Sequence, residues 1–313
     1  MLRWGILGPG GIAAKALAPA MREAGHDLAC VGSRSLTRAQ AFAANHGVRR
    51  ARGSYEEVIT AEDVDAVYVC LPNDLHERWS IAALEAGKHV LCEKPLSLDA
   101  AGAGRMAAAS AEHGPMLMEA GMWWFHPRTA AALQAVREER IGQLRHINAV
   151  FSYRLLDAEN FRAQPQHGGG ALLDIGYYGV TAARWFAGQE PDAIRALQRT
   201  WSSRVDGTTT AIMSFPNGPT ASINASFDAV HQQIVELVGT DGVLRLPHAF
   251  NVAGTSVPML LDDEPVASFA ADPYVEMILA FADAVDAGRP APLPIDDSVA
   301  TAEVLDRIRI AAL

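Results

Sequence analysis

The stretch "LLDIGYYGV" at residues 172–180 places one acid and two adjacent tyrosines in an apolar run that follows three glycines. The helical periodicity of this segment predicts that Asp174 and Tyr178 share one helix face, with Tyr177 rotated from Tyr178 by about 100°. When an alcohol is oxidised, a positioned base must take the hydroxyl proton. The spacing favours Tyr178 as this acid/base, and a tyrosine that only packs its ring is the alternative.

A tyrosine has a pKa of about 10, so it needs a nearby cation to act as a base at neutral pH. The segment "CEKPLS" offers Lys94, which ends an apolar strand at the edge where open α/β sheets bind ligands. The alternative is a surface lysine paired with Glu93. Asp174 then has two candidate roles, orienting a substrate hydroxyl or holding Lys94 by charge, and the sequence does not separate them.

The segment "GILGPGGIA" sets Gly8, Gly10 and Ala13 in the GxGxxG/A arrangement between a strand and a helix. This arrangement permits a tight turn, a close approach of a pyrophosphate to the backbone, and close packing of the helix on the strand. We predict a dinucleotide site that also includes Gly11 and Ile12. A glycine-rich connection without a ligand is the alternative.

The end of the second predicted strand reads "VGSRSLTR", where an NAD-binding protein usually carries an acid for the adenosine ribose. A hydroxyl from Ser33 and a guanidinium from Arg34 suit a 2′-phosphate, and Arg38 could add a second positive charge. We therefore predict NADP as the cofactor, with NAD possible. The alternative is that both arginines are ordinary surface residues.

Short apolar runs alternate with helical patterns over the first 120 residues, which indicates βαβ units and a doubly wound parallel sheet. From about residue 143 the chain carries longer strand patterns separated by Gly, Pro and Asn turns, typical of a large antiparallel sheet. Helical patterns close the chain at about 272–287 and 295–311. We predict an α/β protein with a Rossmann domain at 1–120 and an α+β domain with a large, mostly antiparallel open sheet at 121–313.

Composition excludes several other classes of protein. The formal charge of -10 and the lack of a clustered basic run argue against nucleic acid as a partner. No apolar run approaches the length of a membrane span, and we expect a cytoplasmic protein without a metal site. Cys30, Cys70 and Cys92 lie in apolar strand patterns without a CxxC pair, so reduced core thiols are expected.

The combination of "LPNDLH" at 71–76, "AGKHVLCEKPLS" at 86–97 and "GGGALLDIG" at 168–176 resembles the family of glucose-fructose oxidoreductase, inositol dehydrogenase and a rhizopine catabolism protein. The resemblance covers nearly the whole chain. It implies a cis peptide before Pro95, and Lys94 in contact with a substrate hydroxyl and the nicotinamide ribose. His76 could instead be a helix-start residue without a ligand. The predicted cofactor contacts from these turns are Leu71, Pro72, Asn73, His76, Glu93 and Lys94.

Many members of this family carry DxGxH, with a histidine where this chain has Tyr178. The departure resembles the branch that contains dimeric dihydrodiol dehydrogenase and NADP-dependent xylose dehydrogenase. The resemblance also implies that Arg162 faces the substrate or nicotinamide; an exposed loop arginine is the alternative. A substrate could stack on Trp123 or Phe125 of "GMWWFHPR", although aromatic clusters more often pack in a core.

These features predict an NADP-dependent enzyme that moves a hydride to or from a hydroxyl-bearing carbon of a sugar, cyclic polyol or dihydrodiol. The predicted catalytic residues are Lys94, Tyr178 and Asp174, and the predicted substrate contacts add Trp123, Phe125 and Arg162. Family members commonly pair through the C-terminal sheet, so the resemblance implies a homodimer or homotetramer. The alternative is a sensor of the same fold that binds the dinucleotide without catalysis.

Overall fold

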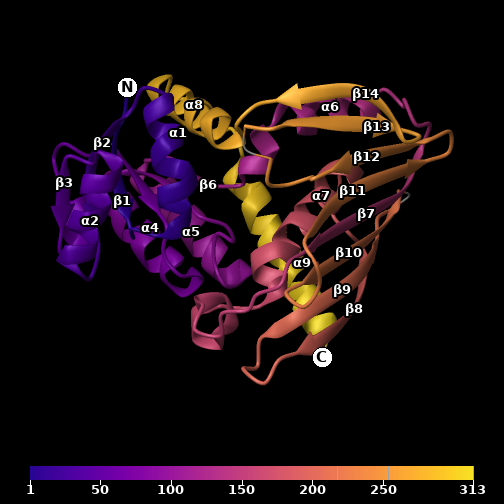
Figure 1. Cartoon of the computed structure of the whole chain (residues 1–313), viewed down its shortest axis with the longest axis horizontal. Helices are drawn as coiled ribbons and strands as arrows, with labels where there is room; N and C mark the ends of the chain where they lie inside the picture. Colours follow the sequence, from indigo (N-terminus) through magenta and orange to yellow (C-terminus); the bar gives the residue numbers. More distant parts are fainter. Residues whose placement is uncertain (217, 253, 313) are drawn as a thin grey trace. The chain divides into compact units, whose positions relative to one another are not determined.

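The computed structural model describes residues 1–216, 218–252 and 254–312. The chain forms two compact units (Figure 1). The first unit contains Met1–Met122 and Tyr274–Val299, and the second contains Trp123–Pro273 and the chain from Ala300 onward. The segment 274–299 therefore belongs to the first compact unit although it lies near the end of the chain.

The first unit is built on a six-stranded parallel sheet with the order β3-β2-β1-β4-β5-β6, which confirms the predicted doubly wound sheet. Its strands are β1 (Arg3–Leu7), β2 (Asp27–Gly32), β3 (Arg50–Arg52), β4 (Ala66–Val69), β5 (His89–Cys92) and β6 (Leu117–Glu119). The strand order reverses between β1 and β4. Open α/β sheets bind ligands beyond the carboxyl ends of the strands at such a reversal.

Helical segments of the first unit connect these strands. They are the π-helical turn η1 (Ala13–Leu17), α1 (Ala18–Glu23), α2 (Leu36–His46), α3 (Glu56–Ile59), the 3-10 turn η2 (Asn73–Leu75), α4 (His76–Glu85), α5 (Ala100–His113) and α8 (Pro273–Asp286). Helix α8 belongs here because Phe281 packs against Trp4 of β1, with 5.3 Å between the ring centroids. A helix from the C-terminal part of the chain thus contributes to the core of the first unit.

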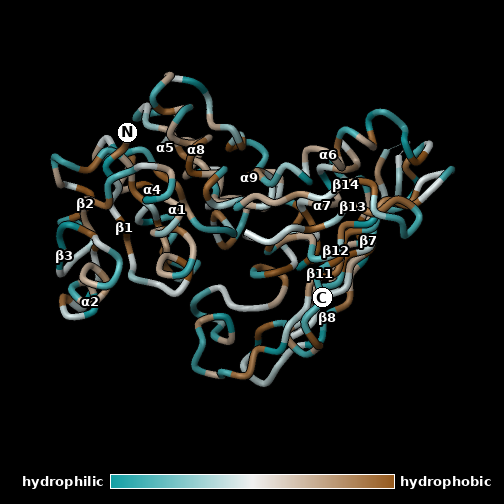
Figure 2. Tube along the Cα trace, turned by 45° about the horizontal axis from the view of Figure 1, so that its top comes forward, coloured by the Kyte–Doolittle hydropathy of each residue, from teal (hydrophilic) through white to brown (hydrophobic). Residues whose placement is uncertain are grey.

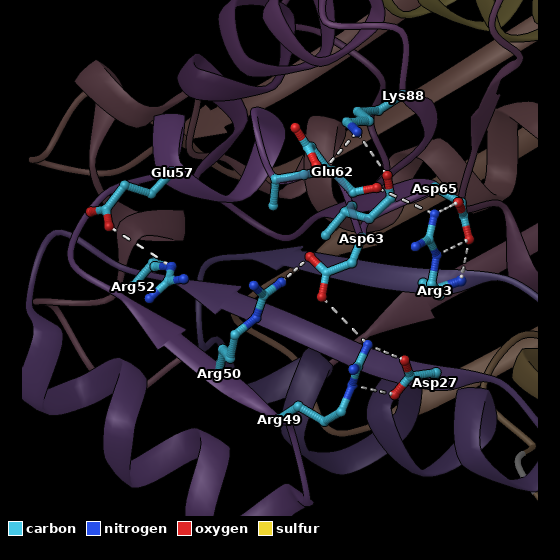
Figure 3. A network of polar contacts seen from close by, with 12 residues as sticks. Arg3, Asp27, Arg49, Arg50, Arg52, Glu57, Glu62, Asp63, Asp65 and Lys88 are labelled. Carbon is cyan, nitrogen blue, oxygen red and sulfur yellow. Dashed lines mark hydrogen bonds and ion pairs between the residues drawn. The ribbon is translucent and has the colours of Figure 1, made fainter.

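A network of charged side chains lies at the amino-terminal ends of the strands of this sheet (Figure 3). Arg3 makes a two-pronged contact with Asp65, with Nε to Oδ2 at 2.9 Å and an η-nitrogen to Oδ1 at 2.5 Å. Arg49 pairs with Asp27 at 2.5 Å and lies 3.6 Å from Asp63. These charges stabilise the edge opposite to the one that holds the glycine loop, and they have a structural function.

The second unit contains an eight-stranded sheet with the order β14-β13-β12-β11-β7-β10-β9-β8. Its strands are β7 (Leu144–Ser152), β8 (Ala193–Thr200), β9 (Asp206–Ser214), β10 (Thr220–Ser226), β11 (Gln232–Gly239), β12 (Val243–Pro247), β13 (Ser256–Leu261) and β14 (Glu264–Ala270). Strands β7 and β10 pair in parallel, and the other neighbouring pairs are antiparallel. The prediction of a large, mostly antiparallel sheet is therefore confirmed.

Helix α7 covers one face of this sheet. The helical segments here are η3 (Met122–Phe125), α6 (Pro127–Arg137), η4 (Phe161–Ala163), η5 (Pro165–His167), η6 (Leu172–Gly176), α7 (Tyr177–Ala187) and α9 (Ile295–Ala311). Gly179 of α7 lies so close to β10 that a Cβ there would be 3.1 Å from Cβ of Ile223. Alternate residues are buried along β7 (Ile147, Ala149 and Phe151) and along β11 (Gln233, Val235 and Leu237), and Figure 2 shows hydrophobic segments in these strands. Across the described parts of the chain, no helix has the length and apolar content to cross a membrane.

Candidate active site

The loop after β1 contains three glycines, of which Gly8 is buried and Gly11 is exposed. Gly8 has a φ of +95°, and a Cβ there would be 2.5 Å from the carbonyl oxygen of Cys70. A Cβ on Gly10 would be 2.9 Å from Cys70 Sγ, whereas a Cβ on Gly11 would meet nothing within 4 Å. Ile12 has helical dihedrals and leads into η1. Because a side chain at Gly8 or Gly10 would collide with Cys70, these glycines let the loop run close to the end of β4, at the reversal point where open α/β sheets bind ligands.

The thiol of Cys70 lies against Gly10 of this loop. It is not a reactive group. Burial raises the pKa of Cys70 to about 12, so the thiol is neutral at physiological pH. Cys30 and Cys92 are buried strand residues, and burial also raises the pKa of each. All three cysteines are free, as the sequence predicted.

The predicted 2′-phosphate residues lie together after β2. The Ser33 hydroxyl accepts a hydrogen bond from the Ser35 backbone N–H at 3.2 Å, and Ser33 is buried. Arg34 and Arg38 are exposed, and Arg38 lies in the first turn of α2, where its N–H is capped by the Ser35 hydroxyl at 3.4 Å. Two guanidinium groups and a short polar loop fit the doubly charged phosphate that distinguishes NADP from NAD.

The turn after β5 contains a cis peptide bond between Lys94 and Pro95, as the family resemblance implied. The Glu93 carboxylate accepts hydrogen bonds from the Tyr68 hydroxyl at 2.5 Å and from the Lys94 backbone N–H at 3.2 Å. The N–H of Leu96 donates to the buried Glu119 carboxylate at 2.6 Å. Side chains from β4 and β6 thus fix both ends of the turn that carries Lys94.

His76 ties this turn to the "LPN" turn after β4. The ring is fully buried, with Nδ1 2.8 Å from the carbonyl oxygen of Pro95 and Nε2 2.9 Å from that of Leu71. Burial lowers the pKa of His76, which favours the neutral ring with one N–H donor. His76 is also the first residue of α4. Its ring lies between the carbonyl oxygens of Pro95 and Leu71 and so contacts both turns. Pro72 and the buried Asn73 directly follow Leu71 in the chain.

In the second unit, the side chains of Arg162 and Tyr153 both bind Asp174. The Asp174 carboxylate accepts hydrogen bonds from Arg162 Nε at 2.8 Å and from the Tyr153 hydroxyl at 2.9 Å. Asp174 is buried and Arg162 is half-buried, with its guanidinium stacked 4.4 Å over the Phe161 ring. Arg162 is therefore an ion-pair partner of the predicted catalytic acid, a contact that neither of the proposed roles for Asp174 included.

Tyr153 is a member of this cluster that sequence reasoning missed. Burial, followed by the negative charge of Asp174, raises the pKa of the Tyr153 phenol well above its usual value, so it donates a proton in the hydrogen bond. Tyr153 lies directly after β7, in "FSYRLL". Residues at strand ends often belong to ligand sites, so this position could have indicated Tyr153 as a site residue. The sequence shows no link between it and Asp174, which lies 21 residues further along the chain.

Tyr178 lies beside this cluster with its ring enclosed by aromatic residues. The ring centroid is 5.3 Å from that of Phe151 and 5.1 Å from that of Phe250, and Tyr178 is only 5% exposed. Tyr178 lies close enough to Tyr153 to contribute to the raised pKa of the Tyr153 phenol. The expected continuous α-helix begins with a π-helical turn at 172–176, and π-turns are frequent at functional sites. Asp174, Tyr153 and Tyr178 thus converge at the start of α7.

A second glycine turn precedes this helix, and the half-buried Asp206 lies against it. The Asp206 carboxylate accepts hydrogen bonds from the Leu172 N–H and the Thr209 hydroxyl, both at 2.7 Å. Gly170 has a φ of +119°, and any Cβ on it would collide with this carboxylate. Burial raises the pKa of Asp206 to about 6. Sequence reasoning missed Asp206, which carries no motif of its own.

The two predicted aromatic contacts have different environments. Trp123 is 1% exposed, its ring stacks on Trp185 with 4.6 Å between centroids, and its Nε1 donates to the Thr181 hydroxyl at 3.2 Å. This is the core packing that the sequence analysis held as its alternative. Phe125 is half-buried, so its contact with a substrate stays a prediction.

A glycine cradle at the reversal point of a parallel sheet, joined to an open sheet with a buried acid, arginine and tyrosine cluster, defines a class of two-domain nicotinamide-dependent oxidoreductases. A family model described as "Oxidoreductase family, NAD-binding Rossmann fold" matches residues 2–120, and a GFO/IDH/MocA C-terminal domain model matches residues 129–245. The chain belongs to the GFO/IDH/MocA oxidoreductase family, which confirms the resemblance drawn from its motifs.

Curated and solved relatives fall in the same family. The chain is 37% identical to D-xylose 1-dehydrogenase (NADP(+)) 2 of Haloferax volcanii, over 98% of this chain and 96% of that protein. It is 34% identical to trans-1,2-dihydrobenzene-1,2-diol dehydrogenase of Bos taurus, over 78% and 74% of the two chains. The structure of KijD10, a 3-ketoreductase from Actinomadura kijaniata in complex with NADP and TDP-benzene, matches with a TM-score of 0.92 at 33% identity, covering 99% and 97%.

Proposed function

We propose that this protein is an NADP-dependent oxidoreductase that transfers a hydride between the nicotinamide and a hydroxyl-bearing carbon of a sugar, cyclic polyol or dihydrodiol. The observation that carries the proposal is the buried cluster of Asp174, Arg162 and Tyr153 beside Tyr178. A helix that needed only to be packed would not bury a carboxylate beside two tyrosines and hold it with a half-buried arginine, because burying charge costs free energy.

The residues that would hold the cofactor fit it chemically. Gly8, Gly10 and Gly11 offer backbone to the pyrophosphate, and the arginines after β2 offer charge to a 2′-phosphate. When bound, the nicotinamide supplies the hydride acceptor or donor. The 3-ketoreductase and the xylose dehydrogenase among the relatives both carry NADP in their descriptions, which supports the choice of NADP over NAD.

Proton transfer is assigned to Tyr178. In the oxidising direction its phenolate would accept the hydroxyl proton, and in the reducing direction its neutral phenol would donate one. Lys94 is proposed to supply the positive charge that makes a phenolate accessible near neutral pH. Asp174 is proposed to orient the substrate hydroxyl while Arg162 compensates the charge of its carboxylate.

The substrate class is supported by the relatives, whose names include a pentose, an aromatic dihydrodiol and a deoxysugar nucleotide. The test is a panel of aldoses, inositols, dihydrodiols and keto sugars, assayed by nicotinamide absorbance with NADP and with NAD. The proposal expects NADP-linked turnover of at least one member. Tight NADP binding without turnover of any member would favour the non-catalytic sensor.

We further propose that two copies associate through the sheet face opposite α7. On that face His146 hydrogen-bonds Thr220 and Ser222 at 2.8 and 3.1 Å, and Leu197 and Ile212 are 80% and 56% exposed. A polar, pre-ordered face with exposed apolar residues suits an interface between identical surfaces. Light scattering after size exclusion should give a dimer or tetramer, and a monomer at micromolar concentration would contradict this.

A further inference from the structure

We infer that Asp206 is a positioning residue that fixes the Asp174–Arg162 ion pair by holding the glycine turn that joins their backbones, an inference that rests on the proposed function. Asp206 is the first residue of β9. The turn consists of the three glycines at 168–170, a motif that has no role in the proposed function so far. The contacts of this turn lead from Asp206 to both members of the ion pair.

One side of the turn is joined to the backbone of Arg162. The Gly170 N–H donates to the carbonyl oxygen of Arg162 at 2.8 Å, and the Gly169 N–H donates to that of Gln164 at 3.1 Å. A Cβ on Gly169 would collide with the Arg162 carbonyl oxygen. The segment that carries Arg162 therefore lies directly against the turn, because glycine leaves room for the contact.

The other side of the turn is joined to the backbone of Asp174. The Asp174 N–H donates to the carbonyl oxygen of Gly170 at 3.2 Å, so Gly170 binds the backbones of both members of the ion pair. Its φ of +119° lies in the region that favours glycine. A displacement of Gly170 would move Asp174 and Arg162, whose side chains meet at 2.8 Å.

Asp206 holds this turn in place from the neighbouring strand. Its Oδ1 occupies the space that a side chain on Gly170 would need. Its Oδ2 accepts hydrogen bonds from the Leu172 N–H and from the hydroxyl of the buried Thr209, both at 2.7 Å. Leu172 is the first residue of η6, the segment that contains Asp174. Because both oxygens are engaged, the carboxylate has a defined position and sets where the turn lies.

The start of β9 also leads to Tyr153, the third member of the cluster. The carbonyl oxygen of Gly207 accepts a hydrogen bond from the Phe227 N–H at 2.8 Å. The Phe227 ring lies 5.1 Å from the Tyr153 ring, and the Tyr153 hydroxyl binds Asp174 at 2.9 Å. The residues 206 and 207 thus support all three side chains of the cluster.

The contacts of Asp206 require a hydrogen-bond acceptor of this length. An asparagine has a carbonyl oxygen with two lone pairs, so it can accept from both Leu172 and Thr209. An alanine cannot, and it would leave the Leu172 N–H without its acceptor and the space beside Gly170 empty. The two substitutions therefore separate the hydrogen bonds of Asp206 from its charge.

The test compares Asp206→Ala with Asp206→Asn in steady-state kinetics with the best substrate of the panel. Asp206→Ala should lower kcat by about tenfold, because a misplaced ion pair orients the substrate less well, and should leave the NADP dissociation constant within about twofold. Asp206→Asn should keep kcat within about threefold of wild type. In an Asp174→Asn background, Asp206→Ala should cause no further loss of kcat, since it acts through Asp174.

Asp192→Ala is the control, because Asp192 is an exposed acid that binds the Ser214 hydroxyl at 2.5 Å at the other end of β9. It should turn over as the wild type does. Thr209→Val serves as a second variant if Asp206→Ala does not fold. It removes one of the two hydrogen bonds to Oδ2 and should lower kcat by about threefold, again with no further loss in the Asp174→Asn background.

Two failures can be told apart. If Asp174→Asn lowers kcat while Asp206→Ala binds NADP and keeps wild-type kcat, the role of Asp206 is wrong and the proposed function stands. A loss of kcat that is equally large with and without Asp174→Asn would also rule out positioning through Asp174. If Asp174→Asn itself keeps wild-type kcat, the proposed role of Asp174 fails, and the role of Asp206 fails with it.

Discussion

The two glycine turns of this protein lead into the same local structure but prepare different chemistry. Each is followed by a π-helical turn, η1 or η6, and then by an α-helix. At Gly8 and Gly10 the missing side chains clear space beside Cys70. At Gly170 the missing side chain clears space for the Asp206 carboxylate. In the proposed function the first turn binds a ligand through its own backbone, whereas the second positions side chains that come from other segments.

The origin of the functional groups differs accordingly. The cofactor cradle comes from one continuous stretch, with supports from adjacent strand ends. The cluster at Asp174 draws Tyr153 from the end of β7 and Arg162 from η4, and Asp206 from the start of β9 anchors the turn before it. A cluster assembled over such sequence distances depends on the whole fold of the second unit. Substitutions there should affect both catalysis and stability.

Among the residues that support Tyr178, Asp174 should give the largest effect. Asp174→Asn keeps the shape but removes the charge that Arg162 and Tyr153 bind, so we expect kcat to fall by about 100-fold. Tyr153→Phe removes one hydrogen bond from the same carboxylate and should cost less than about tenfold. Steady-state kinetics with the best substrate of the panel measures both. Equal kcat in Asp174→Asn and wild type would remove Asp174 from the mechanism.

The second glycine turn can be tested by comparing two alanines at left-handed positions. Gly170→Ala must displace Asp206, whereas Gly114, with a φ of +92°, has nothing within 4 Å of its Cβ position. Both variants share the backbone strain, and only the first has the steric collision. We expect Gly170→Ala to lose about 2 kcal/mol more unfolding free energy than Gly114→Ala in urea titrations. Equal losses would mean that the carboxylate moves aside at no cost.

Asp206 should make stability depend on pH in an unusual direction. Its folded pKa is raised from 3.8 to about 6, so its neutral form favours the fold, and that contribution is lost as the pH rises through about 6. Asn at this position cannot titrate. The unfolding free energy of Asp206→Asn minus that of wild type should therefore increase from about pH 4 to about pH 8, by up to about 3 kcal/mol. A difference that stays constant with pH would show that Asp206 titrates normally.

The smallest effect is expected at the opposite edge of the first sheet. The hydrogen bond from Arg3 is the main cause that lowers the pKa of Asp65, so this pair stabilises the fold above the ordinary pKa and loses its effect in acid. Both side chains are partly exposed and screened by water, so Arg3→Gln should lower the unfolding free energy only slightly at neutral pH and almost not at all below about pH 3, as measured by urea titrations. Cofactor binding should not change, since this edge is remote from the glycine loop.

The parts that could be predicted from the sequence are those that the local chain determines. The parallel sheet, the glycine cradle, the cis turn at Lys94 and the terminal helices follow from periodicity, turn residues and family motifs. The packing of α8 on Trp4 and the approach of Tyr153 and Asp206 to the start of α7 do not, because they depend on contacts between distant segments. The π-turn at 172–176 also has no distinctive sequence pattern.

In the proposed function, Tyr178 accepts or donates the hydroxyl proton, and the first glycine turn and the arginines after β2 bind the cofactor. The most direct test measures the NADP dissociation constant and kcat on one preparation of Tyr178→Phe, beside wild type and Tyr178→His, which carries the residue of many relatives. We expect NADP affinity within about twofold for all three proteins, a loss of kcat of at least about 100-fold for Tyr178→Phe, and a smaller loss for Tyr178→His. Wild-type turnover by Tyr178→Phe would rule out Tyr178 as the acid/base.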